Sequence, residues 1–413
     1  MKNKLILLSV SLFAYHCSFC QTTSEWRGIG RTGVYNEKGL LQSWPEKGPD
    51  LLWSAGDMPK GNSSVSISNN TIYLTGMKDT NEYLIALEMK GSLKWKIAYG
   101  HSWNNSFPES RSTPTIDNNK VYVTSGMGEL VCMDASSGSI IWKVNACEKF
   151  HGAFGNWGIA ESPLVVDNKV FITVGGDQTT TVALDKNNGE TIWVTESIHD
   201  RPSYVSPMII EKAGKKIITA VTEKNIIGIN ASDGKILWIF DYGQYAKDNK
   251  NIQANTPLFY KNGIFVTNGY DHKSVMLKLA DDASSVSLTW IDSVMDVHIG
   301  GAVRIGEYIY GSNWIGNGNG HWTCLDWNTG KVMYEKEWFN KGPIIANEGF
   351  LYCYEEKTGN IALVKATPEK FEVTSSFKIK MGSGPHWAHP VINNGILYIR
   401  HGDVLMAYDI RQK

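Results

Sequence analysis

The chain has 413 residues, with 40 lysines and arginines against 41 aspartates and glutamates, so its formal net charge is −1. This balance argues against a nucleic-acid-binding surface as the main function, because such domains usually carry a large basic excess. Forty glycines and 15 tryptophans favour short strands and tight turns over a helical bundle, a coiled coil or a membrane transporter.

The N-terminus is typical of an export signal. Lys2 and Lys4 precede a mostly apolar stretch, 5–15, that is too short to span a bilayer. A small-x-small pattern ending at Cys20 predicts cleavage there. The alternative is lipidation at Cys17 or Cys20, which the bulky preceding residues disfavour. We therefore expect a periplasmic or secreted protein without a transmembrane segment.

Four cysteines remain after such cleavage: Cys132, Cys147, Cys324 and Cys353. Export permits disulfides, but Cys132 and Cys324 occupy matching positions in two different repeat units and should lie far apart. None of these four cysteines forms a CxxC pair of the metal-binding kind. We interpret these cysteines as buried apolar side chains.

One pattern recurs along the chain: a Pro or small residue, a short apolar strand, an Asn or Gly turn, a second strand, a third strand ending in Leu-Asp, a Gly turn, and Trp. The units open at Ser64, Pro114, Pro163, Pro207, Pro257, Ala302, Pro343 and Pro390. Their fourth strands carry Trp95, Trp142, Trp193, Trp238, Trp290, Tyr334 and Phe377. Four short strands per unit of 41–50 residues predict an all-β, eight-bladed β-propeller of four-stranded antiparallel blades.

The last unit supplies only three strands and lacks its Trp. An orphan segment of the missing type, Leu51-Leu52-Trp53, precedes the first unit, so we expect it to pair with the last unit and close the ring. Seven blades are the alternative if a weak unit is irregular. The chain thus divides into a signal peptide (1–20), an N-terminal extension (21–50) and one propeller (51–413). Within the extension, Gly28 to Gly33 matches GxGxxG by letter, but its context rejects a dinucleotide site.

The recurring Leu-Asp-x-x-x-Gly-x-x-x-Trp ending, as in Leu184-Asp185 through Trp193, resembles the repeat of quinoprotein dehydrogenases, whose cofactor is pyrroloquinoline quinone (PQQ). The resemblance covers nearly all of the mature chain, and the N-terminal Trp26-Arg27-Gly28 is similar to secreted PQQ-like proteins of Bacteroidetes and Planctomycetes. It implies the propeller fold and, in some members, PQQ with Ca²⁺. The same propeller also serves as a non-catalytic scaffold in outer-membrane assembly.

Propeller geometry places the long connections after strands two and four on one face, around the central channel, where a ligand site is expected. Six of the ten histidines fall in segments just ahead of the innermost strands, together with several tryptophans. We expect glycines beside His298 and in the run 316–320 to let a ligand approach the backbone. The alternative is that these polar groups only bond to one another and fill the channel.

We assign candidate roles on this face from residue type and from the resemblance. The candidate catalytic groups are His298, Asp296, His386 and Lys341. The candidate cofactor-binding groups are Arg111, Trp157, Tyr204, Trp314, Trp387 and His389. The resemblance implies Glu161 and Asn255 as ligands of a Ca²⁺ ion beside PQQ.

Three functions remain open from the sequence. The first is a ligand-binding propeller, with a quinoprotein-type dehydrogenase as its enzymatic form, although the chain lacks an adjacent-cysteine pair and a CxxCH haem motif. The second is a non-catalytic exported scaffold that binds a protein partner. The third is a sugar-active hydrolase or lyase, since aromatic side chains stack on sugar rings.

Overall fold

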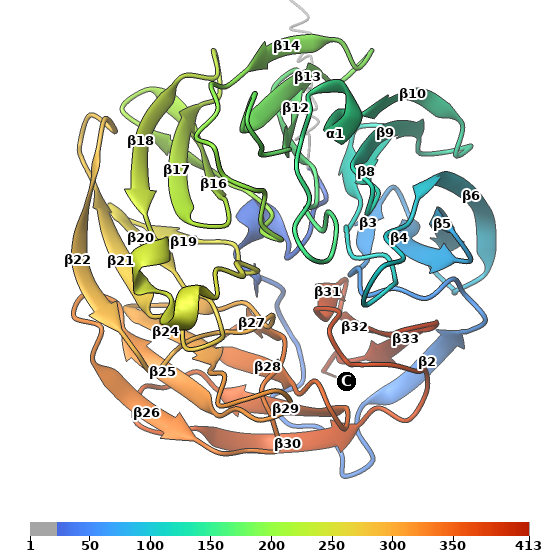
Figure 1. Cartoon of the computed structure of the whole chain (residues 1–413). Helices are drawn as coiled ribbons and strands as arrows, with labels where there is room; N and C mark the ends of the chain where they lie inside the picture. The colour runs from blue at the N-terminus through green and yellow to red at the C-terminus, as the bar shows by residue number, and fades with distance from the viewer. Residues whose placement is uncertain (1–22, 413) are drawn as a thin grey trace, which may run out of the picture.

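The computed structural model describes residues 23–412, and in this range the chain forms eight sheets arranged in a closed ring (Figure 1). The signal peptide predicted at 1–20 lies outside the described residues. The fold is an eight-bladed β-propeller, so the eight-blade prediction is confirmed and the seven-blade alternative is wrong. Within the same range, no helix is long and apolar enough to cross a membrane.

Each blade consists of four antiparallel strands numbered from the channel outward. Blades one to four comprise β3 (Ser66–Ser68), β4 (Thr71–Lys78), β5 (Asn81–Glu88) and β6 (Leu93–His101); β7 (Thr115–Asp117), β8 (Lys120–Thr124), β9 (Glu129–Asp134) and β10 (Ile140–Asn145); β11 (Leu164–Val166), β12 (Lys169–Thr173), β13 (Thr181–Asp185) and β14 (Thr191–Val194); and β15 (Met208–Lys212), β16 (Lys215–Val221), β17 (Asn225–Asn230) and β18 (Ile236–Asp241).

The second half of the ring repeats this plan. Blades five to eight comprise β19 (Leu258–Tyr260), β20 (Gly263–Val266), β21 (Ser274–Leu279) and β22 (Val286–Asp292); β23 (Val303–Ile305), β24 (Tyr308–Ser312), β25 (Trp322–Asp326) and β26 (Val332–Lys336); β27 (Ile344–Asn347), β28 (Phe350–Tyr354), β29 (Asn360–Lys365) and β30 (Glu372–Lys378); and β31 (Val391–Asn393), β32 (Ile396–His401), β33 (Val404–Asp409) and β2 (Asp50–Ala55). The helical pieces are α1 (Ala146–Lys149), η1 (Ile29–Arg31), η2 (Gly243–Tyr245) and η3 (Lys247–Asn249).

The ring closes as expected, because β2 pairs antiparallel with β33 and places Trp53 opposite Ala407. Blade eight is thus built from both ends of the described chain. Apolar packing is organised by blade seam: the described residues form eight hydrophobic clusters, each containing side chains of two neighbouring blades. Burial between sheets, rather than one central core, stabilises the ring.

The tryptophan repeat has a common geometry. In each blade the pairing of the third and fourth strands carries a register shift of the bulge type. The shift lies next to the fourth-strand aromatic residue in seven blades, whereas in blade seven Ser375 holds that position and Phe377 lies two residues further on. Trp142 illustrates the packing: its indole lies against Gly189 in the turn of the next blade, and its Nε1 donates to the Lys186 carbonyl there at 3.1 Å. The expected wedge between blades is confirmed, and the Gly of each Asp-x-x-x-Gly turn makes room for it.

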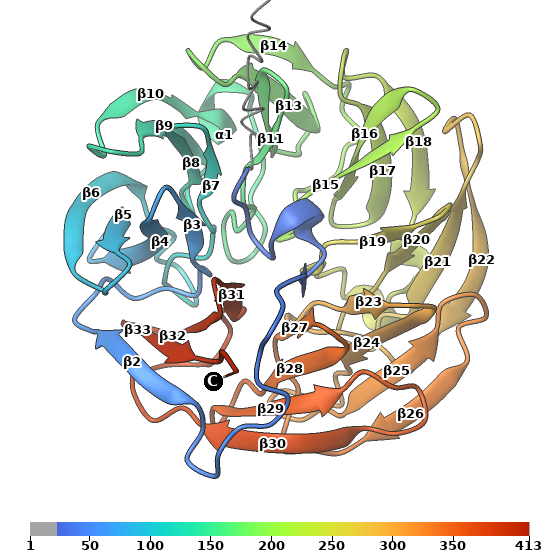
Figure 2. The same ribbon diagram turned by 180° about the vertical axis from the view of Figure 1, so that it is seen from behind.

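The N-terminal extension lies across the middle of the ring on the face opposite the long loops (Figure 2). Ser24 exchanges two backbone hydrogen bonds with Ile116 of blade two. The two-residue strand β1 (Val34–Tyr35) pairs in parallel with β27 of blade seven. Gly28 to Gly33 forms a 3₁₀ turn rather than a strand–turn–helix unit, which agrees with rejecting a nucleotide site.

Two buried arginines attach this extension to blades that are distant in sequence. Arg31 donates to the carbonyls of Ser162 and Pro163 at 3.0 and 2.6 Å and pairs with Glu25 at 2.9 Å. Arg27 donates to the Ala302 carbonyl. The segment separated from the propeller in the sequence analysis is therefore a part of the wheel that holds several blades at the axis.

The four cysteines are free and buried. Cys132, Cys324 and Cys353 have no exposed surface, and each lies in an apolar cluster at a blade seam. Burial raises the pKa of Cys132 to about 11 and that of Cys324 to about 12. The interpretation as buried apolar side chains is confirmed.

Candidate functional site

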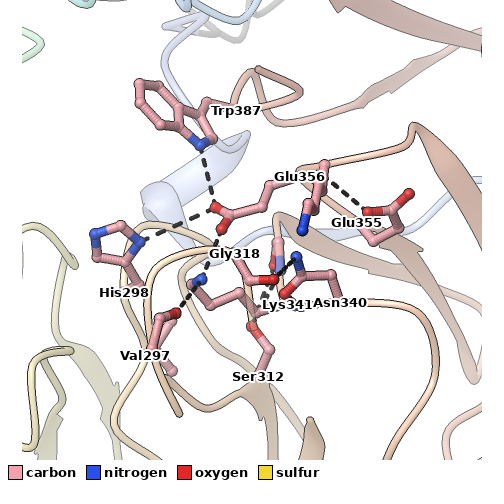
Figure 3. A network of polar contacts seen from close by, with 12 residues as sticks. Val297, His298, Ser312, Gly318, Asn340, Lys341, Glu355, Glu356 and Trp387 are labelled. Carbon is pink, nitrogen blue, oxygen red and sulfur yellow. Dashed lines mark hydrogen bonds and ion pairs between the residues drawn. The ribbon is translucent and has the colours of Figure 1, made fainter. Parts of the chain in front are cut away.

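A buried ion pair marks the centre of the long-loop face. Lys341 Nζ lies 2.7 Å from Glu356 Oε1, and the two side chains are 1% and 9% exposed. Trp387 Nε1 donates to Glu356 Oε2 at 3.1 Å, and Lys341 also donates to the Gly316 carbonyl at 3.0 Å. Figure 3 shows the indole, the ammonium group and His298 directed toward the one carboxylate. Such a pair needs these extra hydrogen bonds, because desolvation of both charges is costly.

His298 lies beside this pair with one ring nitrogen unused. Its Nε2 is hydrogen-bonded to the Tyr270 hydroxyl at 2.8 Å, whereas its Nδ1, 4.0 Å from Glu356 Oε2, has no hydrogen-bond partner in the described chain. Burial, and then the positive charge of Lys341, lower the pKa of His298 to about 3. The imidazole is therefore neutral at physiological pH, with a polar atom available to a third group.

Asp296 is held two residues before His298. Its carboxylate accepts hydrogen bonds from the backbone N–H groups of Trp314 at 3.0 Å and Asp271 at 3.1 Å. Burial raises its pKa to about 7 despite these bonds. Tyr270 packs against both Trp314, with ring centroids 5.1 Å apart, and His298. Asp296, His298 and Trp314 thus belong to one cluster, as the sequence suggested, and burial brings the Asp296 carboxyl into the neutral pH range.

A second cluster of predicted residues adjoins the first through an exposed aromatic ring. Arg111 donates to the carbonyls of Trp157, at 2.6 Å, and Phe107. The ring centroids of Trp157 and Tyr204 are 5.2 Å apart, and Phe107 lies 6.1 Å from Trp157 and 6.4 Å from Trp387. Phe107 is 61% exposed, so an aromatic row runs from blade four to blade eight across the face.

The side chains of His386 and His389 are buried among protein groups and are not open to a ligand. His386 Nδ1 is hydrogen-bonded to the Tyr354 hydroxyl, and its ring stacks on His401 with centroids 3.7 Å apart. His389 Nε2 lies 2.9 Å from the Gly300 carbonyl, and its ring contacts Trp26 of the extension. Burial is the main cause of the low pKa of both, about 4 for His386 and about 3 for His389.

Glu161 and Asn255 bond to backbone of the blades. The Asn255 amide donates to the Val297 carbonyl at 2.6 Å and accepts from Gly301 N–H at 3.0 Å. The Glu161 carboxyl accepts from Thr173 N–H at 3.1 Å, and burial raises its pKa to about 8. Both Glu161 carboxyl oxygens face Thr173 N–H and both ends of the Asn255 amide are engaged with backbone groups, so neither residue presents a free oxygen to a Ca²⁺ ion. Residues 23–412 contain no group of three or more His, Cys, Asp or Glu side chains that could hold a metal ion.

Three of the glycines expected to admit a ligand are packed against the chain itself, whereas Gly316 has open space around it. A Cβ at Gly300 would lie 2.1 Å from the Gly342 carbonyl oxygen, and one at Gly301 would lie 2.5 Å from Arg27. At Gly320 it would meet the Asn313 carbonyl oxygen at 2.2 Å and Lys341. Gly300, Gly301 and Gly320 therefore allow segments of the protein to pack closely around the channel, whereas for Gly316 and Gly318 the expectation stays a prediction.

Sequence reasoning missed three residues of the site: Glu356, Tyr270 and Phe107. Glu355-Glu356 follows the second strand of blade seven, the same position as Asn313-Trp314 in blade six. Comparing these positions across all units would have found Glu356. Phe107 lies in the connection that leads from blade one to blade two, and no repeat position marks it.

The fold and this face define a class of protein: an eight-bladed propeller with stereotyped blades and a polar, aromatic centre on its long-loop side. The sequence model of the family described as "Outer membrane protein assembly factor BamB" matches residues 80–336, more than half of the chain. The chain therefore belongs to this family of PQQ-like propellers.

Individual relatives agree with this assignment. The outer membrane protein assembly factor BamB of Yersinia pestis is 22% identical over 278 residues, which is 65% of this chain and 67% of that protein. Among solved structures, BamB from Moraxella catarrhalis has a TM-score of 0.63 at 13% identity, over 88% of this chain and 98% of that one. A europium-containing methanol dehydrogenase has a TM-score of 0.68 at 13% identity, over 92% and 90%. These structural likenesses show the shared fold.

Proposed function

We propose that this protein is an exported propeller that binds a polar ligand at the centre of its long-loop face. The single observation that carries the proposal is the unused Nδ1 of His298 beside the buried Lys341–Glu356 pair. A pair that served the fold alone would be expected to have its buried neighbours fully hydrogen-bonded. A ligand hydroxyl or amide placed between His298 and Glu356 would complete this set.

The surroundings favour a sugar-like ligand. The site offers hydrogen-bond acceptors on Glu356, a donor on Lys341 and a neutral imidazole on His298. The aromatic row of Phe107, Trp157 and Trp387 provides flat apolar surface next to these groups. Closely spaced hydroxyl groups on a ring with an apolar face match this combination.

If the protein also catalyses a reaction of this ligand, Asp296 and His298 are the groups placed to exchange protons. Lys341 is then the group placed to stabilise negative charge. His386 bonds to Tyr354 and stacks on His401, so it would act only by positioning neighbouring loops. Because Glu161 and Asn255 do not fit a Ca²⁺ ion, no step through PQQ is included in the proposal. Export is part of it, and rests on the apolar N-terminal stretch and the family relationship.

The test is a thermal-shift and calorimetric titration of the mature chain with a panel of neutral mono- and disaccharides. We expect at least one to bind, and we expect Glu356→Gln and Lys341→Met to weaken that binding at least tenfold. Lys357→Met, on an exposed neighbour of Glu356, should leave the affinity within twofold. Circular dichroism of each variant separates loss of binding from loss of folding.

A non-catalytic scaffold is the second candidate, and a specific observation favours it. Phe107, Ile315 and Phe339 on the long-loop segments are 61%, 49% and 60% exposed, which gives this face apolar side chains that a protein partner could cover. The family name describes an assembly factor. Binding of no sugar in the panel, with the folded variants indistinguishable from the parent, would overturn the ligand proposal and leave the scaffold.

A further inference from the structure

A pocket outside the ion-pair centre opens over blade four, between the connections that precede and follow it. It encloses about 670 Å³ and is lined by His199, Asp200, Arg201, Glu223, Lys224, Asn249 and Asn251. These residues come from the segment before β15, the turn between β16 and β17, and the connection that follows η3. None of them belongs to the cluster around Glu356, so the pocket is a separate candidate site.

The hydrogen-bonding capacity of the two acidic groups in this pocket is already used by the protein, although only Glu223 is paired with a cation. The Glu223 carboxylate accepts hydrogen bonds from Arg201 Nε and Nη2 at 2.8 and 2.6 Å, in a bidentate pair. Asp200 accepts four hydrogen bonds, from the backbone N–H groups of Arg201 and Lys224, the Thr222 hydroxyl and the Asn225 amide. Carboxylates so engaged have little capacity left for a ligand cation.

The remaining groups are mostly donors. Within residues 23–412, the Lys224 ammonium group and Arg201 Nη1 make no hydrogen bond or ion pair. His199 is 74% exposed, and its Nδ1 approaches only Asp177, at 3.4 Å. The formal charges of the lining residues balance, but the hydrogen-bonding groups still free are the donors of Lys224 and Arg201, which favour an anionic ligand at that edge of the pocket.

One acceptor in the pocket is also unused. Asn251 Oδ1 is buried without a hydrogen-bond partner in the described chain, while its Nδ2 donates to the Asn249 carbonyl at 3.3 Å. A buried amide oxygen without a donor is costly, and a ligand hydroxyl would satisfy it. A ligand that matches these groups would carry an anionic group near Lys224 and a hydroxyl group near Asn251.

We propose that this pocket binds a small hydroxylated anion of the sugar-acid or sugar-phosphate class. Lys224 and the free edge of Arg201 contact the anionic group, and Asn251 accepts a hydrogen bond from a neighbouring hydroxyl. The volume is that of a small-metabolite site. The Arg201–Glu223 pair limits affinity, because Glu223 occupies two of the donors of Arg201 that would otherwise face the anion.

The test uses the mature chain carrying Glu356→Gln, which disables the channel site proposed to bind neutral sugars. This variant is titrated by calorimetry with galacturonate and glucose 6-phosphate, and with galactose and glucose as neutral probes. At least one of the anions should bind, and its neutral parent should bind at least tenfold more weakly. Lys224→Met should weaken anion binding at least fivefold. Glu223→Gln should strengthen it about threefold by releasing Arg201, an effect that a merely structural role would not produce.

Two controls make the result decisive. Lys247→Met removes a neighbouring cation that pairs with Asp271 at 2.9 Å outside the pocket, and should change affinity less than twofold. Anion binding should persist in the Glu356→Gln chain, which separates this proposal from the site at the channel. No binding of either anion, equal binding of neutral and anionic sugars, equal effects of the two lysine substitutions, or weaker binding by Glu223→Gln would each overturn the proposal.

Discussion

At the scale of single residues, hydrogen bonding and the neighbouring charges together distinguish structural from functional buried polar groups. Arg400 is fully buried, yet it donates to the carbonyls of Ser63, Thr75, Pro59 and Gly402 and so joins blade eight to blade one. Arg31 joins the extension to blade three in the same way. His298 keeps an unused nitrogen beside charged groups. Arg27 Nε and Nη1 also lack partners in the described chain, yet Arg27 bonds the extension to the start of blade six. We therefore assign the arginines to the architecture and His298 to the site.

Glu161 gives a residue-scale prediction about pH. Its pKa is raised by burial from 4.5 to about 8, so the folded protein keeps a proton that the unfolded chain releases between these values. The free energy of unfolding should then fall as the pH rises from about 4.5 to about 8. Glu161→Gln, which can still accept from Thr173 N–H, should remove this contribution and raise stability at pH 8 by about 2–4 kcal/mol.

Urea unfolding at pH 5 and pH 8 measures this effect. At pH 5 the parent and Glu161→Gln should agree within about 1 kcal/mol, because the parent carboxyl is then also neutral. Glu211→Gln, on the exposed part of β15, is the matched control and should behave like the parent at both values. A Glu161→Gln variant less stable than the parent at pH 8 would show that the carboxyl is ionised and stabilising.

At the scale of the strand and turn, the repeat is a packing device between neighbours. Gly189 has φ +75°, and a Cβ there would lie 2.9 Å from two ring atoms of Trp142. Gly189→Ala should therefore suffer both backbone strain and a clash, with a loss of about 2–4 kcal/mol in the free energy of unfolding. Chemical denaturation of the purified variant measures the loss.

Gly214 supplies the control for this prediction. Its φ is +72°, but nothing lies within 4 Å of a Cβ at that position. Gly214→Ala should cost only the strain of the left-handed backbone, about 1 kcal/mol. Equal losses of unfolding free energy in the two variants would mean that the Trp142 indole moves aside freely. Glycine would then be required at position 189 only because of the positive φ.

The elements were predictable from sequence because their signals are local. Pro163 precedes β11 by one residue and Pro343 precedes β27 by one residue, so turns and apolar runs located the innermost strands. The site was less predictable, because its members meet only through the ring. Phe107 and Trp387 are 280 positions apart in sequence yet lie 6.4 Å apart by ring centroid. Arg27 and Arg31 were unexpected as buried residues, since only the axis of a closed ring offers them carbonyl partners.

At the scale of the whole molecule, the aromatic row of the site depends on ring closure, because Trp387 before blade eight meets Phe107 before blade two. The ion-pair cluster comes from the consecutive blades six to eight. Glu356 and Trp387, from blade seven and the segment leading to blade eight, meet Lys341 and His298 from segments before blades seven and six. Closure rests on non-covalent pairing in blade eight, where β2 adds to β33. The extension reinforces it, since Leu41 N–H donates to the Ile410 carbonyl at 2.7 Å and Gln412 N–H to the Gly39 carbonyl at 2.8 Å.

This arrangement predicts that equivalent tryptophans have unequal effects. Trp53 and Trp142 hold the same repeat position, and each donates to a carbonyl of the following blade, at Met89 and Lys186. Trp53→Ala and Trp142→Ala should each lower the free energy of unfolding by about 3 kcal/mol. Only Trp53→Ala weakens the strand that joins the two ends of the chain, and separation of those ends gains conformational entropy.

Hydrogen exchange measured by mass spectrometry distinguishes the two variants. In Trp53→Ala, peptides covering 391–409 should exchange at least tenfold faster than in the parent, because blade eight opens locally before the rest unfolds. In Trp142→Ala the faster exchange should be confined to blades two and three, with 391–409 still protected. If 391–409 kept its protection in Trp53→Ala, the pairing of β2 with β33 would not be the weak point of the ring, and the extension across the axis would be the principal closure.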